Sequence, residues 1–68
     1  MKIRIDYERE TDGRWLAEVV SLPGVMAYGA NRKEAMAKAE TLALRVLAER
    51  LEHNEGKPEP ITINFKAA

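Results

Sequence analysis

The chain has 68 residues, no cysteine and one histidine, and its 11 Lys and Arg residues balance 11 Asp and Glu residues. This composition excludes disulfides, thiolate metal sites and histidine-rich metal sites. It also disfavours a stand-alone nucleic-acid binder, because such proteins are usually basic. A domain this small has a single modest core, which rarely supplies more than about 3–5 kcal/mol of net stability. We therefore expect a homo-oligomer.

Nothing in the chain is typical of a membrane span or a targeting segment. No apolar run approaches the ~18–20 residues that cross a bilayer. The first six residues, Met-Lys-Ile-Arg-Ile-Asp, alternate in character and lack the apolar stretch of a signal peptide. We expect one domain, residues 1–68, located in the cytoplasm and not bound to a membrane.

The first 20 residues predict a β-hairpin. Strict alternation over residues 2–9 is typical of a half-buried strand. Asp12 and Gly13 provide the chemistry of a tight turn. Residues 14–20 predict the returning strand. One of its faces holds Trp15, Ala17 and Val19, and the other holds Leu16, Glu18 and Val20. Because the second face is only one-third charged, we expect this strand to be central and partly covered on both sides.

The middle of the chain predicts a turn and a short third strand. Leu22, Pro23 and Gly24 end the second strand, because proline lacks the N–H that a sheet needs and glycine permits unusual φ. Residues 25–28 predict a third strand, which Gly29 closes.

A long helix is the clearest predicted element. Asn31 predicts its N-cap, and Glu34 lies where a capping-box acid reaches back. From there to His53 the chain contains no Gly or Pro. Residues 57–60 predict an extended linker, and residues 61–66 alternate as a last strand. The order β-β-β-α-β predicts an α+β fold, a small two-layer domain in which one long helix covers an antiparallel-rich sheet.

The predicted helix is apolar over more of its circumference than one core needs. The stripe expected to face the sheet contains Ala35, Ala39, Leu42 and Val46, with Ala43 beside it. A second group outside that stripe includes Leu44, Leu47 and Leu51. A single exposed leucine needs no explanation. Leu16 and Val20, however, independently indicate that the outer sheet face is covered, so we predict that these five residues contact another chain.

The sequence predicts neither an enzyme nor a cofactor. Asp6, Glu8 and Glu18 are the residue types of a metal-dependent nuclease, but ion pairs with basic residues of the same sheet face explain them more simply. His53 has no second His or Cys with which to bind a metal, and we expect it to interact with the helix dipole. Three aromatic residues are candidates for stacking on bases, although the zero net charge disfavours it. They are Tyr7, Trp15 and Tyr28.

A series of motifs extends from residue 3 to about residue 65. It consists, in chain order, of Asp12 and Gly13, then Leu22, Pro23 and Gly24, then Gly29, and finally Glu34 and Ala35. In this order and spacing the series resembles the HicB-like antitoxin domain family. Asn31 stands where that family usually has Thr, and Val25 stands where many members have Cys.

The resemblance implies a degraded ribonuclease-H-like arrangement of the fold and a role in a type II toxin–antitoxin system. Antitoxins of this family bind and occlude a small HicA-type ribonuclease toxin, and they commonly form dimers or tetramers. Many also have a C-terminal DNA-binding domain. We expect none here, and no direct DNA binding, because the sequence stops just after the last predicted strand.

Three functional hypotheses follow from these observations. The first is an antitoxin-like module that inhibits a small toxin. The second is an orphan self-assembling structural or regulatory protein without a toxin partner. The third, which we disfavour, is a weak nuclease that uses Asp6, Glu8 or Glu18.

Overall fold

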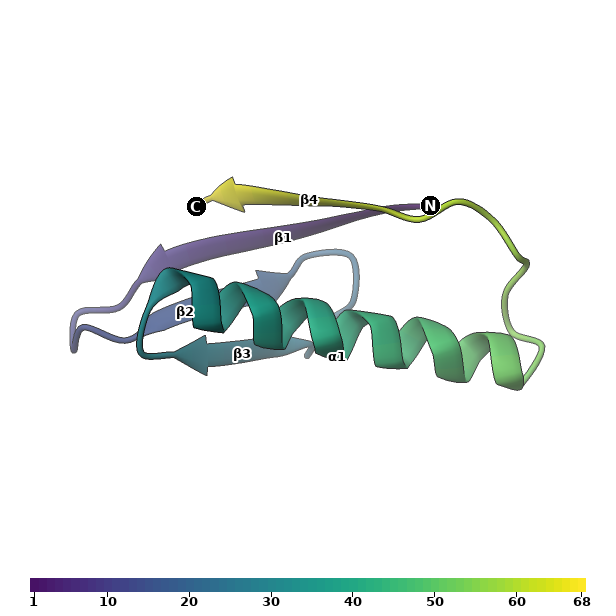
Figure 1. Cartoon of the computed structure of the whole chain (residues 1–68), viewed down its shortest axis with the longest axis horizontal. Coiled ribbons are helices and arrows are strands. Elements are labelled where there is room, and N and C mark those ends of the chain that lie inside the picture. The colour runs from purple at the N-terminus through teal and green to yellow at the C-terminus, as the bar shows by residue number, and fades with distance from the viewer.

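The computed structural model describes residues 1–68, which form a four-stranded sheet with one long helix on one face (Figure 1). The elements are β1 (Lys2–Arg9), β2 (Trp15–Val19), β3 (Met26–Gly29), α1 (Arg32–Glu52) and β4 (Thr62–Ala67). The strand order across the sheet is β3-β2-β1-β4. The predicted α+β class, the two layers and the central place of the second strand are confirmed.

The sheet is mixed. β2 pairs antiparallel with both β1 and β3, whereas β4 runs parallel to β1. In this parallel pair Ile3 lies opposite Ile63, and Ile5 lies opposite Phe65. A parallel pair needs a long crossover, which α1 and the extended linker provide. The sheet is therefore antiparallel-rich, as predicted, with one parallel pair at the β4 edge.

A turn at Leu22, Pro23 and Gly24 directs the chain from β2 into β3. The Val25 N–H donates to the Leu22 carbonyl at 3.1 Å, so Pro23 and Gly24 occupy the two central positions of the turn. Gly24 has a φ of +84°, which the second central position of a type II turn requires. Leu22 is only 4% exposed. The same short motif thus sets the turn and fills part of the core.

The junction between β3 and α1 is tight and well capped. A Cβ on Gly29 would lie 2.5 Å from the backbone nitrogen of Ala35, so a larger residue cannot fit without a shift. The Glu34 N–H donates to Asn31 Oδ1 at 2.8 Å. In return, Glu34 Oε1 accepts from the Ala30 N–H at 3.3 Å. The predicted cap at Asn31 is confirmed.

The core is built on the alanines of α1. Its side chains are those of Ile3, Ile5, Ala17, Val19, Leu22, Ala35, Ala39, Ala43 and Leu47. Leu47 is 5% exposed, so its predicted place on an outer interface is wrong. Leu42 and Val46, expected in the core, are only half-buried. The small side chains of the three helix alanines let the helix approach the sheet closely, and the i, i+4 row through them continues to Leu47.

The chain is elongated and exposes more surface than a compact monomer. Its extents are 41 × 17 × 17 Å and its radius of gyration is 12.5 Å, against about 11 Å for a compact chain of this length. The accessible surface is 4879 Å², against about 4,300 Å² expected from the mass. The helix packs on β3, β2 and β1, and Figure 1 shows β4 beyond it.

Candidate protein-interaction surfaces

The residues of the HicB-like motif series serve to build the fold. Besides the turn and the β3–α1 junction, they form the first hairpin. Asp12 Oδ1 accepts from the Arg14 N–H at 3.0 Å, and Asp12 Oδ2 pairs with Arg14 Nε at 2.7 Å. The bond from the Arg14 N–H, followed by that from its side chain, lowers the pKa of Asp12. Gly13 has a φ of +93°. Asp12 and Gly13 therefore shape a loop and do not form a reactive site.

An apolar patch lies on the outer face of the sheet, away from the helix. We call it the outer patch, and it consists of Leu16, Val20, Met26 and Tyr28. Leu16 is half-buried and lies opposite Tyr28 in the sheet. Val20 is 48% exposed, and Met26 and Tyr28 are also exposed. The face of Leu16 and Val20, which we predict another chain to cover, is open in the single chain and continues over two residues of β3.

Two acidic side chains accompany the outer patch. Glu8 lies opposite Leu16 at the β1 side of the patch, and Glu18 lies within it, between Leu16 and Val20 and opposite Met26. Both are exposed, and neither forms an ion pair within the chain. The patch therefore has two carboxylates that are free to meet a basic partner.

The third carboxylate of this face, Asp6, is already engaged. Arg4 donates to its two oxygens at 2.7 and 2.9 Å. These hydrogen bonds from Arg4 lower the pKa of Asp6. Asp6 is paired with Glu18 across the sheet, but no three His, Cys, Asp or Glu residues of the chain are grouped to hold a metal ion. The arrangement is that of an ion pair on a sheet surface.

The predicted stacking residues do not form one platform. Tyr7 and Trp15 lie on the helix side, with ring centroids 6.4 Å apart and planes tilted by 44°. Tyr28 lies on the outer face, with the Arg14 guanidinium 4.3 Å from its ring centroid. His53 is the C-cap of α1, with Nδ1 2.9 Å from the Glu49 carbonyl oxygen. Its expected place at the helix end is confirmed.

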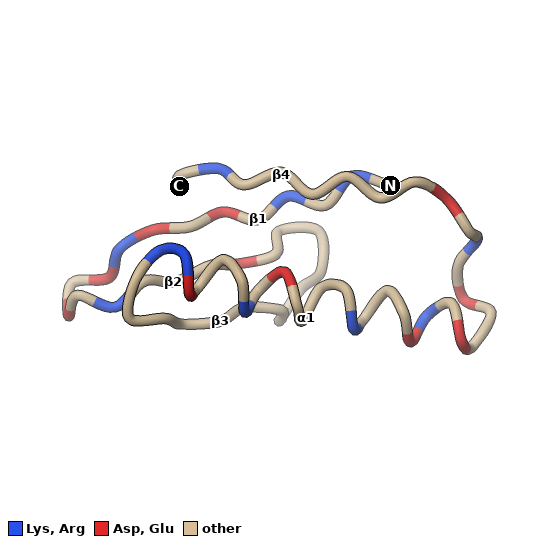
Figure 2. Tube along the Cα trace, in the orientation of Figure 1, with Lys and Arg blue, Asp and Glu red and all other residues tan.

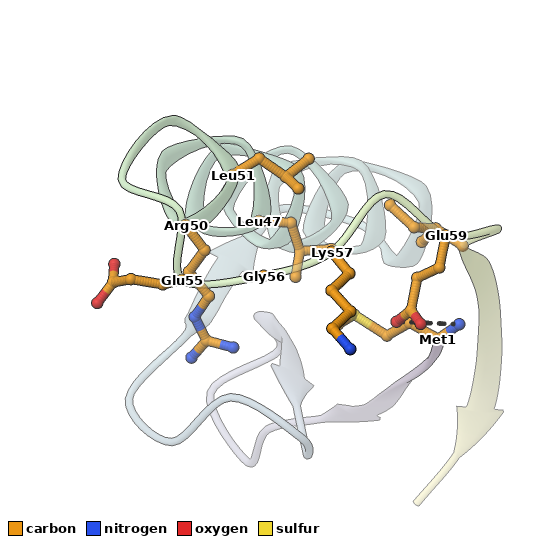
Figure 3. Close-up of a pocket in the computed structure, with 9 residues that line it drawn as sticks. Met1, Leu47, Arg50, Leu51, Glu55, Gly56, Lys57 and Glu59 are labelled. Atoms are coloured by element: carbon orange, nitrogen blue, oxygen red, sulfur yellow. Dashed lines mark ion pairs between the residues drawn. The ribbon is translucent and has the colours of Figure 1, made fainter.

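A small hollow lies where the end of α1 faces the linker (Figure 3). Its lining includes Met1, Leu47, Leu51 and Ile61. The amino group of Met1 pairs with Glu59 at 3.5 Å beside it. Its volume is about 80 Å³, well below the roughly 300 Å³ at which ligand pockets begin. Leu44 and Leu51, predicted to contact another chain, are each 44% exposed.

The helix-side face of β4 is the apolar surface that sequence reasoning missed. Ile61 is 42% exposed and Phe65 is 38% exposed, although Ile5 beside Phe65 is fully buried. Lys66 is the one charged residue in β4, and Figure 2 shows the rest of the strand without charge. The alternation of residues 61–66 looks like that of any half-buried strand. Only the position of the helix shows that Ile63 is half-buried and that Phe65 stays exposed.

Comparison with protein-family models, with curated proteins and with solved structures gave no match to this chain. No helix of the structure is long and apolar enough to cross a membrane.

Proposed function

We propose that this chain is an antitoxin-like binding module of a type II toxin–antitoxin system. It would inhibit a small HicA-type ribonuclease toxin by occluding it in the cytoplasm, without catalysis and without binding DNA directly. The motif series from Asp12 to Ala35 supports the assignment by its resemblance to the HicB-like domain. The observation on which the proposal chiefly rests is the outer patch with its two unpaired carboxylates.

The outer patch has the features expected of a surface that covers a ribonuclease. An RNA-cleaving protein binds phosphates and is basic around its RNA site. Glu8 and Glu18 offer two unpaired carboxylates to such a surface, while Leu16 and Val20 offer apolar area on either side of Glu18. Complementary charge speeds association and selects the partner, and the apolar side chains supply affinity.

Co-expression with a neighbouring HicA-like toxin tests this proposal. We expect growth to be restored and a complex to elute on gel filtration. The double variant Glu8→Lys, Glu18→Lys should lose both, because it places like charges against the toxin. The matched control Glu49→Lys, Glu52→Lys makes the same charge change on exposed positions of α1 and should still protect. Continued growth arrest with the unmodified chain, and no complex, would exclude the inhibitor function.

A second candidate, an orphan self-assembling protein, is favoured by the exposed face of β4. The gene neighbourhood separates the two candidates. An adjacent small toxin gene supports the antitoxin, and an isolated gene supports self-assembly alone.

A further inference from the structure

The edge of the sheet at β4 has free backbone groups whose direction can be assigned. The Thr62 N–H donates to the Met1 carbonyl at 2.8 Å, and the Ala68 N–H donates to the Tyr7 carbonyl at 2.9 Å. In a strand of a parallel pair, alternate residues turn their N–H and C=O groups to opposite sides. The even-numbered residues of β4 therefore bond to β1. Ile63, Phe65 and Ala67 direct theirs outward.

These outward-facing residues also carry the apolar side chains of β4. The side chains of Ile63 and Phe65 lie on the helix side, opposite Ile3 and Ile5. Ile63 is half-buried against the edge of the core, whereas Phe65 is exposed. Natural edge strands are usually protected by charges, proline, bulges or short length. β4 has six residues, no proline within it and one charge. Lys66, near its end, is the one protecting feature among these, and the apolar stretch from Ile63 to Phe65 has none.

We propose that β4 pairs antiparallel with β4 of a second copy of this chain, forming a continuous eight-stranded sheet. This seam is separate from the outer patch and does not depend on a toxin. The outward backbone groups must face each other, so odd-numbered residues of the two strands are opposite. Among such registers we assign the one with Ile63 opposite Phe65 of the partner subunit and Asn64 opposite Asn64 of the partner subunit. Two pairs of a β-branched and an aromatic side chain then form across the seam, a combination that stabilises sheets.

The charge in β4 favours this register over a shifted one. With Asn64 at the centre, Lys66 lies opposite Thr62 of the partner subunit, whereas a shift of the centre to Lys66 would oppose two like charges. The register also uses the whole strand, since Ile61 then lies opposite Ala67 of the partner subunit.

The surface area of the chain agrees with a second copy as the occupant. The accessible surface of 4879 Å² exceeds that of a compact monomer by roughly 550 Å². A standard dimer interface takes about 800 Å² from each partner. The excess surface is therefore of the same order as the area that one partner contributes to a standard dimer interface.

Single cysteines test the seam directly, because the chain has none of its own and every disulfide must join two copies. In the proposed register the two copies of residue 64 form a pair without backbone hydrogen bonds, with Cα atoms about 4.5 Å apart, which a disulfide can span. Asn64→Cys should therefore give an oxidised dimer. Thr62→Cys, on the same sheet face, should stay monomeric on a denaturing gel, because its two copies are about 13 Å apart.

Solution mass completes the test and does not depend on the cysteines. The unmodified chain should have twice the monomer mass by light scattering at high micromolar concentration. Phe65→Lys should reduce the mass to that of a monomer with an unchanged circular dichroism spectrum, whereas Tyr28→Lys at the other edge should remain dimeric. A monomeric unmodified chain would overturn the proposal. So would cross-linking of Thr62→Cys, or of Leu44→Cys on the helix, in place of Asn64→Cys.

Discussion

The two edges of the sheet differ in how the fold protects them. The β3 edge has four residues, and Lys38 Nζ from α1 lies 3.5 Å from the outward carbonyl of Tyr28. At its end Gly29 is in close contact with the first turn of the helix. The β4 edge is longer, and within it only Lys66 offers protection. An edge strand that the helix contacts can end the sheet, whereas an edge strand with free backbone groups can pair with another strand.

The largest expected effect is the difference in unfolding free energy between truncating a buried side chain of β1 and truncating an exposed one of β4. Ile5 and Phe65 are opposite each other on the same sheet face, but the first is fully buried and the second is 38% exposed. Ile5→Ala should cost about 3.5 kcal/mol of unfolding free energy, through lost burial and a cavity. Phe65→Ala should cost under about 1 kcal/mol in the dilute monomer. Urea denaturation at low protein concentration measures both, and equal losses would show that β4 is covered.

The next largest effect should come from the tight end of β3. Gly29→Ala puts a methyl group against the backbone of Ala35 and should cost about 2 kcal/mol. Gly56→Ala is the matched control, because its added Cβ would lie an ordinary 3.9 Å from Leu51 Cδ2. For a domain of this size each kcal/mol shifts the melting temperature by roughly 4–8 °C. A control that melts as early as Gly29→Ala would contradict the tight junction.

The cap of α1 should contribute less. Asn31→Ala removes the acceptor of the Glu34 N–H and should destabilise the fold by about 1 kcal/mol. Asn64→Ala makes the same chemical change on the exposed outer face of β4 and should be nearly neutral in the monomer. Thermal unfolding followed by circular dichroism compares the two variants, and identical melting temperatures would argue against the cap.

The smallest expected effect is on the acid stability of the fold and concerns Lys38. Its Nζ contacts the Tyr28 carbonyl at the β3 edge and pairs with Glu34 at 3.1 Å. The hydrogen bond from Lys38, followed by that from the Ala30 N–H, lowers the pKa of Glu34. The stability that Glu34 contributes is therefore complete above its unfolded pKa of about 4.3 and is lost as the pH falls through the lower folded value. In Lys38→Met this acid-dependent loss should shrink. Acid unfolding curves of identical shape would exclude the coupling.

Most of the fold could be predicted from local patterns. Alternation around Ile3 and Ile5 gave the first strand, and Asn31 with Glu34 placed the start of the helix. The position of Leu47 was predicted wrongly, because helical spacing placed Leu42 and Val46 with Ala35 and Ala39 in one stripe. The buried row instead follows the i, i+4 spacing from Ala35 to Leu47, and Leu42 and Val46 lie at its side.

The exposed apolar surfaces could be predicted only in part. Four residues predicted from strand alternation and helix periodicity to lie outside the core do lie there, exposed or half-buried. They are Leu16, Val20, Leu44 and Leu51. The exposure of Phe65 was not predicted. Alternation within β4 shows that Phe65 and Ile63 share a sheet face, but it does not show whether the helix covers that face at Phe65. The lateral placement of α1 depends on long-range packing that a local pattern does not contain.

Amide hydrogen exchange across a range of protein concentrations tests the pairing of β4 most directly. The N–H groups of Ile63 and Phe65 should become protected as the concentration rises and the mass doubles. Those of Met26 and Tyr28, at the β3 edge, should show no such dependence on concentration. Exchange of the Ile63 and Phe65 amides at unprotected rates in a sample whose mass is that of a dimer would contradict the β4 seam.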